Sequence, residues 1–275
     1  MPTASILMVP PTFFSVDYAI NPWMNLHTAV DTALALAQWQ DLKHTLATKC
    51  HASVLEVPPI DRLPDMVFVA NAAIILPPLA SGRERVLLAR FFNEERQGEE
   101  AYFQQWFEEQ GYWVEKSPAH LPFEGAGEAL AWNGFWFASY GQRAVREAHS
   151  WLAYYSGQPV ISLELVDPKF YHLDVAFCPT DLGYVLYYPA AFSTDSLALL
   201  EAIIPPEKRL IVPESEALQF ACNAVSVGSH IVLPCEAPTL RQQLEATGHT
   251  VHCVEYSEFI KAGGATKCST LKLPL

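Results

Sequence analysis

One structural unit recurs along this 275-residue chain at intervals of roughly 50 residues. The pattern within each unit predicts a β-hairpin, a helix and a further strand, after which the next hairpin begins. Every hairpin region opens with a polar or glycine-rich element; these elements are Asp65, Glu124, His172, Cys222-Asn223 and Gly263-Gly264. A period of this length is typical of repeat architectures, even where the units share negligible sequence identity.

The secondary-structure signal is clearest at Asn133-Gly134, a dipeptide that favours a two-residue hairpin turn between strands over 129–132 and 135–139. Other expected hairpin strands are 175–178 with 184–188, and 224–227 with 230–233. Apolar periodicity predicts helices over 28–50, 94–110, 143–155, 194–203 and 239–247. Single strands are expected to follow these helices, over 53–57, 112–115, 160–163, 209–212 and 250–254.

The fold predicted from this order is a ring of five units in the α/β class. No low-complexity or linker-like stretch interrupts the chain, and its Pro-Pro pairs are typical of turns inside a domain. We therefore expect a single domain over 1–275 with a central channel, on which the polar openings of the five units converge.

The charge of the chain bears on its partners. Acidic residues outnumber basic residues by 30 to 17, and the formal net charge of −13 disfavours a nucleic-acid backbone or an anionic membrane as partner. The charge would mildly favour the approach of a cationic small molecule, but simple solubility is the preferred explanation. No apolar run reaches transmembrane length.

The cysteines and the amino-terminal segment indicate a cytoplasmic protein. Residues 1–9 lack a basic region and are expected to form a strand, not a signal peptide. Six cysteines without a secretion signal are expected to be reduced thiols. No CxxC pair is present and the histidines suggest no metal-like cluster, so we expect no structural zinc, no catalytic metal and no cofactor.

Cys268 is the best candidate nucleophile among the thiols. It follows Gly263-Gly264, where the backbone can approach a ligand closely, and Lys267 beside it could depress its pKa towards the reactive thiolate. The other cysteines lie in apolar contexts typical of a core. The alternative is that Cys268 is a structural thiol as well.

His172 is the best candidate acid–base group, because a histidine that is distant in sequence but close in space commonly activates a cysteine. On a strand, His172 and Asp174 would share one face, where Asp174 could orient the imidazole or bind a cation. A structural ion network is the alternative for this pair.

Three further polar residues flank apolar segments. Glu124 precedes a glycine-rich stretch and suits a pocket wall or a partner for the histidine, although a simple loop turn is the alternative. Asp65 and Asn71 are six residues apart, which would put them on one face of an extended strand. The alternative for these two residues is a strand with polar ends.

Five short segments, taken in order, resemble the guanidine-modifying superfamily, which includes arginine deiminases, amidinotransferases, dimethylarginine dimethylaminohydrolases and arginine dihydrolases. They span nearly the whole chain and are Asn21-Pro22-Trp23-Met24, Asp65-Met66-Val67-Phe68-Val69-Ala70-Asn71, Phe123-Glu124-Gly125, His172-Leu173-Asp174 and Gly263-Gly264…Cys268. The resemblance implies a five-bladed ββαβ propeller, the pentein fold, and a substrate that is arginine or a methylated arginine.

The resemblance also implies roles for these residues. Cys268 would be the nucleophile, His172 the general acid and base, and Glu124 the carboxylate partner of the histidine. Asp174 would contact the guanidinium. The remaining substrate-binding positions would be Asp65 for the α-ammonium, Arg90 and Arg143 for the α-carboxylate, and Asn21 and Asn71.

Asn71 distinguishes the reactions within the superfamily, because hydrolases that stop at citrulline typically carry an acidic residue at this place. With Asn21-Pro22-Trp23-Met24, the chain is more similar to arginine dihydrolases, which convert arginine to ornithine, carbon dioxide and two ammonia. An asparagine could accept from a guanidinium N–H and later donate to a neutral ureido oxygen. A citrulline-forming hydrolase is the alternative; an amidinotransferase or a silent arginine-binding ring is less favoured. The oligomeric state is left open.

Overall fold

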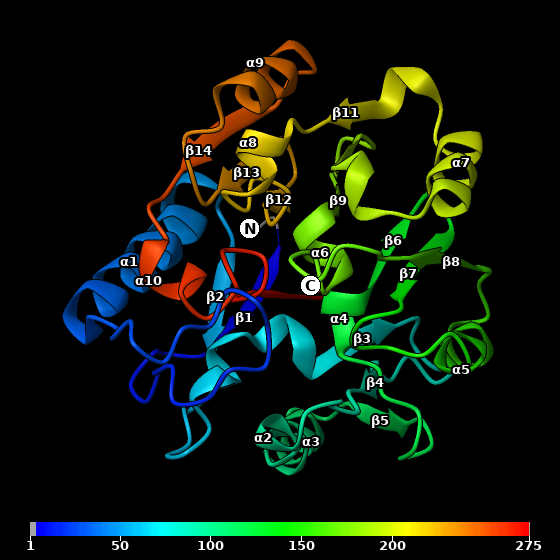
Figure 1. Cartoon of the computed structure of the whole chain (residues 1–275). Coiled ribbons are helices and arrows are strands. Elements are labelled where there is room, and N and C mark those ends of the chain that lie inside the picture. The colour runs from blue at the N-terminus through cyan, green and yellow to red at the C-terminus, as the bar shows by residue number, and fades with distance from the viewer. Residues whose placement is uncertain (1–3, 275) are drawn as a thin grey trace.

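The computed structural model describes residues 4–274, and in this range fifteen strands form five three-stranded sheets arranged around a common centre (Figure 1). In strand order, the sheets are β15 (Leu271–Leu273), β1 (Ser5–Met8) and β2 (Ser53–Glu56); β3 (Ala73–Leu76), β4 (Arg85–Leu88) and β5 (Trp113–Lys116); β6 (Ala129–Trp132), β7 (Phe135–Tyr140) and β8 (Val160–Glu164); β9 (Phe177–Pro179), β10 (Val185–Tyr187) and β11 (Arg209–Ile211); and β12 (Val225–Val227), β13 (His230–Leu233) and β14 (Thr250–Cys253).

All five sheets have the same topology. The middle strand pairs antiparallel with the first strand and parallel with the third. Four of the units are therefore a hairpin followed by a crossover helix and a parallel strand, and in the remaining unit β15 takes the place of the first hairpin strand. The ring is closed because the carboxy-terminal β15 pairs with β1 near the amino terminus. This confirms the predicted five-unit α/β architecture. Residues 1–3 of the predicted first strand lie outside the described residues.

The long helices lie at the periphery of the ring, each between the second and third strands of its unit (Figure 1). They are α1 (Thr32–His44), α2 (Glu94–Gln97) with α3 (Glu99–Glu109), α5 (Ala148–Ser156), α7 (Thr194–Ile203) and α9 (Pro238–Ala246). Shorter helical segments are η4 (Pro189–Ala191), η5 (Pro206–Lys208), α8 (Glu214–Ala217) and α10 (Ser257–Ile260). None of the helices among residues 4–274 is long and apolar enough to cross a membrane.

Two helix predictions differ from the structure at their ends. The first helix begins at Thr32 because Asp31 is its N-cap and accepts from the N–H groups of Ala33 and Leu34, and it continues into the π-helix η1 (Thr45–Lys49). The helix predicted over 143–155 begins five residues late, because residues 141–147 form turns.

The polar openings at Asp65, Glu124 and His172 lie in or beside short helical turns, although the sequence predicts two of them on strands. Asp65 and Asn71 lie in the 3-10 segments η2 (Pro64–Val67) and η3 (Val69–Ala72), and Asp174 lies in α6 (Leu173–Ala176), which follows His172. The strand-face arguments for these residues were therefore wrong. Each turn carries its polar side chains inward before the chain enters the first strand of the next sheet.

These turns meet at the centre of the ring. The turn α4 (Gly125–Glu128) packs against both η3 and α6, and Figure 1 shows α4 and α6 close to the common centre. Gly125 has a φ of 58°, and a Cβ there would lie 2.7 Å from the carbonyl oxygen of Asn71. This close approach of two backbones requires glycine.

Candidate active site

Cys268 is held by Asn223 between the last two units of the ring. The backbone N–H of Cys268 donates to Oδ1 of Asn223 at 3.1 Å, and Nδ2 of Asn223 donates to the cysteine sulfur at 3.1 Å. The same Nδ2 donates to the carbonyl oxygen of Asp174 at 3.0 Å. One asparagine side chain therefore fixes the thiol relative to the turn that carries Asp174.

The Cys268 thiol donates to Oδ2 of Asp174 at 3.4 Å, and both residues are buried. The other carboxylate oxygen, Oδ1, has no hydrogen-bond partner among the described residues. Burial raises the pKa of the thiol well above its ordinary value, and Asp174 raises it further. Lys267 lowers this pKa, as expected, but its effect is smaller than those of burial and Asp174, so the thiol pKa stays raised.

His172 forms the second half of the site together with Glu124. Nε2 of His172 lies 2.9 Å from Oε2 of Glu124, and both side chains are fully buried. Glu124 also accepts from the N–H of Phe92 at 3.1 Å and lies 3.5 Å from Nη1 of Arg143. Burial by itself would raise the pKa of Glu124. Arg143 and His172 outweigh this effect and lower the pKa to about 2. Glu124 is therefore an ionised acceptor at neutral pH.

The tautomer of His172 follows from these contacts. An ionised Glu124 only accepts, so Nε2 carries the proton that it shares with Glu124. Nδ1 lies 3.4 Å from Nδ2 of Asn71, an N–H donor, and is the basic nitrogen of the neutral ring. The lone pair that can accept a proton is thus on Nδ1, the nitrogen that faces Asn71.

Arg96 is a central residue that sequence reasoning missed. Its buried guanidinium bonds both carboxylate oxygens of Glu99, at 2.7 and 2.8 Å, and donates to Oδ1 of Asn71 at 3.0 Å. It also donates to the carbonyl oxygen of Asp65 at 3.0 Å. Asn71 was expected to accept from a substrate guanidinium, but its oxygen accepts from Arg96. Its Nδ2 donates to the carbonyl oxygen of Glu124 at 3.2 Å and lies 3.4 Å from Nδ1 of His172. Arg96 lies in the wholly polar segment Glu94–Gln97, so apolar periodicity gave no signal for it.

Glu128 is a second residue that we did not single out. It lies one helical turn from Glu124, is fully buried, and has Oε1 3.6 Å from Nε2 of His172. Ser139 donates to its other oxygen. Burial raises the pKa of Glu128 well above its ordinary value, and the nearby charge of Glu124 raises it further, which favours the protonated form of Glu128.

The loop between β1 and α1 lies over the site. Tyr18 donates to Oδ2 of Asp65 at 3.0 Å, and Arg143 donates to the carbonyl oxygen of Ile20 at 2.7 Å. Asn21 donates to the carbonyl oxygen of Ala262 at 3.0 Å, and its side chain fills the space beside Gly263, where a Cβ would lie 2.6 Å from Oδ1. Asn21 therefore packs against the glycine-rich segment that leads to Cys268.

The predicted substrate-binding residues are not all brought together. Asp65, Asn71 and Arg143 join the buried network around Glu124. Arg90 pairs by its backbone with Phe123, but its guanidinium bonds Glu100 at 2.8 Å and the carbonyl oxygen of Ser117 at 3.1 Å. The role of Arg90 therefore stays a prediction.

A cavity of about 260 Å³ occupies another part of the centre. It is lined by the first strands of the five sheets and by Lys267 and Lys272, and its lining excludes His172, Glu124 and Cys268. The predicted central channel corresponds to this cavity, while the candidate catalytic groups are packed against one another beneath the β1–α1 loop.

No family model matches the chain, but individual proteins do. The bifunctional arginine dihydrolase/ornithine cyclodeaminase ArgZ of Synechocystis sp. is 47% identical over 272 residues, which cover 98% of this chain and 37% of that protein. The N(G),N(G)-dimethylarginine dimethylaminohydrolase of Mycobacterium tuberculosis is 41% identical over 271 residues, covering 98% of this chain and 86% of that protein. The chain thus spans about 37% of the length of its bifunctional relatives.

Solved structures agree with these relatives. The N-terminal domain of ArgZ from cyanobacteria, a cysteine-to-serine variant bound to substrate, has a TM-score of 0.92 at 46% identity and covers 98% of this chain and 97% of that chain. An asparagine-to-serine variant of the same domain, with a TM-score of 0.93 at 45% identity and coverage of 98% for both chains, is covalently bonded to a reaction intermediate. These matches confirm the predicted fold.

Proposed function

Because this chain belongs to the guanidine-modifying superfamily, as its sequence motifs indicated, we propose that it is a cytoplasmic arginine dihydrolase. The products would be ornithine, carbon dioxide and two ammonia, formed through a covalent adduct on Cys268. The observation that carries this choice is the orientation of Asn71, whose N–H donor, and not a carboxylate, lies 3.4 Å from the free nitrogen of His172.

Asp174 provides the site for the guanidinium. Its Oδ1 is buried without a hydrogen-bond partner among the described residues, and its Oδ2 accepts a hydrogen bond from the Cys268 thiol. Burial raises the pKa of this carboxyl above its ordinary value, so a guanidinium that bonded to it would relieve an unfavourable burial. The same cation would offset the effect of Asp174 on the thiol and favour the thiolate of Cys268.

The first hydrolysis begins when the Cys268 thiolate attacks the guanidinium carbon. His172, protonated on Nδ1, gives its proton to the departing amine, and ammonia leaves a thiouronium adduct on the sulfur. Neutral His172 then takes a proton from water as it attacks, and the C–S bond breaks. The sulfur leaves as thiolate and citrulline is formed. Ionised Glu124 stabilises the imidazolium in both halves.

The second hydrolysis requires that citrulline stay bound. Its ureido group is neutral and carries a carbonyl oxygen. The N–H of Asn71 that lies beside Nδ1 of His172 could donate to this oxygen once Nδ1 is protonated, whereas an ionised carboxylate could not. Cys268 attacks the ureido carbon and His172 protonates the second ammonia. Hydrolysis of the resulting thiocarbamate gives a carbamate, which loses carbon dioxide to leave ornithine. Two water molecules are consumed for each arginine.

The amino-acid end of arginine would be held on the side of the β1–α1 loop. Arg143 is a suitable partner for the α-carboxylate because its guanidinium is planar and buried beneath this loop. Asp65 would bind the α-ammonium. The ammonium would then take the place of the Tyr18 hydroxyl, which donates to Asp65 in this structure. Arg90 and Asn21 complete the proposed set. The second candidate function is a methylarginine hydrolase that releases citrulline, since one relative carries that name.

Product analysis separates the two functions. The protein is incubated separately with arginine and with asymmetric dimethylarginine, and ornithine, citrulline, ammonia and dimethylamine are quantified. We expect ornithine and about two ammonia per arginine, as two successive attacks by one nucleophile require. Stoichiometric citrulline without ornithine, or dimethylamine as the main product, would overturn the dihydrolase assignment in favour of the second candidate.

A further inference from the structure

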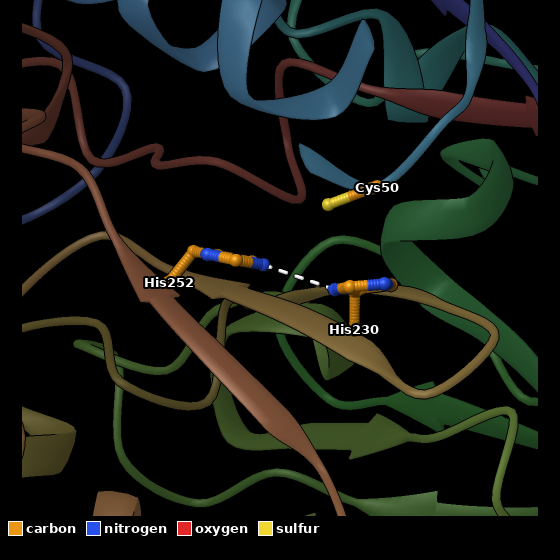
Figure 2. Close-up of side chains that lie close together, drawn as sticks. All are labelled: Cys50, His230 and His252. Atoms are coloured by element: carbon orange, nitrogen blue, oxygen red, sulfur yellow. Dashed lines mark hydrogen bonds between the residues drawn. The ribbon is translucent and has the colours of Figure 1, made fainter. Parts of the chain in front are cut away.

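A second cluster of reactive side chains lies between the first and fifth units, outside the candidate active site. It consists of Cys50, His230 and His252, and Figure 2 shows the two imidazoles side by side with the thiol above them. One potential ligand atom from each residue lies within 4.8 Å of the other two. Nδ1 of His230 and Nε2 of His252 are 3.0 Å apart. The sequence expectation that the histidines form no metal-like cluster is therefore wrong.

The cluster arises from strand register and from the end of a helix. Strands β13 and β14 are parallel, with Val232 opposite His252, so His230, two residues before Val232, has its side chain on the same face as His252. Cys50 terminates the π-helix η1, where its N–H donates to the carbonyl oxygen of Thr45 at 3.1 Å, and η1 packs against β13. Residues about 180 positions apart are thereby brought together.

The distances suit a first-row transition metal. Zinc binds imidazole nitrogen at about 2.0–2.1 Å and thiolate sulfur at about 2.3 Å, so two nitrogens of a tetrahedral site lie roughly 3.3 Å apart. The observed separation of the two nitrogens is 3.0 Å. A side-chain rotation that moves the sulfur by roughly 1 Å would bring it within bonding distance of an ion held by both rings.

The protonation states are compatible with metal binding. Burial lowers the pKa of His252, and His230, Lys49 and Arg241 lower it further, a direction that favours the neutral, ligating form of this imidazole. Burial raises the pKa of Cys50 to about 11. A bound ion would displace the thiol proton, and the resulting thiolate would offset the positive charges of Lys49 and Arg241.

We propose that Cys50, His230 and His252 bind one divalent transition-metal ion of the zinc class, with solvent as the fourth ligand. Both histidines are only partly buried, so solvent reaches the fourth position. The ion would clasp the fifth sheet to the end of the first helix. The loop that carries Cys268 connects the same two units. The bound ion would therefore also limit movement between these units, where the pairing of β15 with β1 closes the ring.

The test must separate this cluster from the candidate active site, which also contains a thiol and an imidazole. The full chain is stripped of metal with a chelator and titrated with Zn²⁺ and with Co²⁺ in a Cys268→Ser background. We expect one equivalent of either ion to bind, and the Co²⁺ form to show the sulfur-to-cobalt charge-transfer absorption of a thiolate ligand. Zn²⁺ is also expected to raise the thermal unfolding midpoint.

His252→Ala is the decisive second substitution, because this side chain is partly exposed and its loss should leave the fold intact. We expect affinity to fall by more than the roughly 10–100-fold that loss of an outer partner of a metal ligand typically costs. His230→Ala should behave in the same way. Cys253→Ser is the matched control, since Cys253 follows His252 on β14 but bonds Arg241 on α9; this variant should bind the ion as the background protein does.

Three results would overturn the proposal: no stoichiometric binding by the Cys268→Ser protein, equal affinity in His252→Ala, or a Co²⁺ complex without thiolate absorption. If wild type binds an ion and Cys268→Ser does not, the metal sits in the candidate active site instead. Cys50→Ser is used only to confirm the thiolate absorption, since this buried residue contributes to the core as well.

Discussion

The two halves of the candidate active site balance their charges in opposite ways. On the acid–base side, Glu124 is paired with Arg143 and His172, and its pKa is lowered to about 2. On the nucleophile side, Asp174 is equally buried but faces a thiol, and burial raises its pKa. In the first half, the carboxylate has an arginine and a histidine as close partners, whereas in the second half Lys267 only partly offsets burial and Oδ1 of Asp174 has no hydrogen-bond partner among the described residues. Under the proposed function, the guanidinium of the substrate would supply the missing partner on the nucleophile side.

The largest expected effect comes from removing the nucleophile. Cys268→Ser should abolish arginine turnover, because a serine hydroxyl is a far poorer nucleophile at neutral pH than a thiolate. The fold, followed by circular dichroism and urea unfolding, should be retained, since the substitution is small. Cys253→Ser is the control and should remain active. Substantial turnover by a folded Cys268→Ser protein would remove Cys268 from the mechanism.

Removing the acid–base group should slow both halves of the reaction. His172→Ala is expected to lose about 10²–10⁴-fold in turnover, the usual contribution of a general acid–base residue. Rapid-quench experiments should show slow release of the first ammonia and slow hydrolysis of any adduct. A rate within a few-fold of wild type would mean that another group moves the proton.

Glu124 and Glu128 are both buried near His172, but their pKa values are shifted in opposite directions, which substitution can test. At pH 7, Glu124→Gln should cost about 3 kcal/mol of unfolding free energy, the value of a pKa lowered from 4.5 to about 2. Because the folded-state pKa is lowered, this stabilisation is present above pH 4.5 and is lost as the pH falls towards about 2.

Glu128→Gln is the matched comparison. The folded-state pKa of Glu128 is raised, so ionisation of the unfolded chain reduces stability as the pH rises above 4.5. Glutamine removes that loss, and Glu128→Gln should therefore be at least as stable as wild type at pH 7. Urea unfolding between pH 3 and pH 8 measures both variants. Equal destabilisation of the two variants at pH 7 would contradict the assigned charge states.

Asn71→Asp should change the product more than the rate. Aspartate would pair with Arg96 and present only acceptors to the ureido group, so citrulline should leave before the second attack. The ratio of citrulline to ornithine, measured by chromatography, is expected to rise. If the product ratio is unchanged, Asn71 is only a structural partner of Arg96.

The smallest effect concerns the reactivity of Cys268 towards two reagents of similar shape. The thiol is buried and its pKa is raised, so neutral chloroacetamide should alkylate it slowly. Cationic chloroacetamidine should react about tenfold faster, because pairing with Asp174 is worth on the order of 1.4 kcal/mol. Asp174→Asn should remove the preference. Equal rates for the two reagents in the wild type would show that no cation is needed on the nucleophile side.

Much of the architecture could be predicted from local signals. The helix over Thr194–Ile203 and the strands over Ala129–Trp132 and His230–Leu233 lie where periodicity and turn residues placed them. The central turns could not be predicted in this way. A segment such as Pro64–Ala72 is apolar and short, and only its packing against α4 and the Cys268 loop decides between strand and 3-10 helix.

The sequence by itself determined the five-unit order, the superfamily and the identity of the polar residues at the centre, because these are properties of spacing and residue type. The tertiary structure alone decided which partner each polar group has. Arg96 donates a hydrogen bond to the oxygen of Asn71, and burial and Asp174 raise the pKa of the Cys268 thiol. Cys50 lies beside two histidines of a unit that is distant in sequence. Such pairings depend on burial and on contacts across the closed ring, and burial and neighbouring charges set protonation.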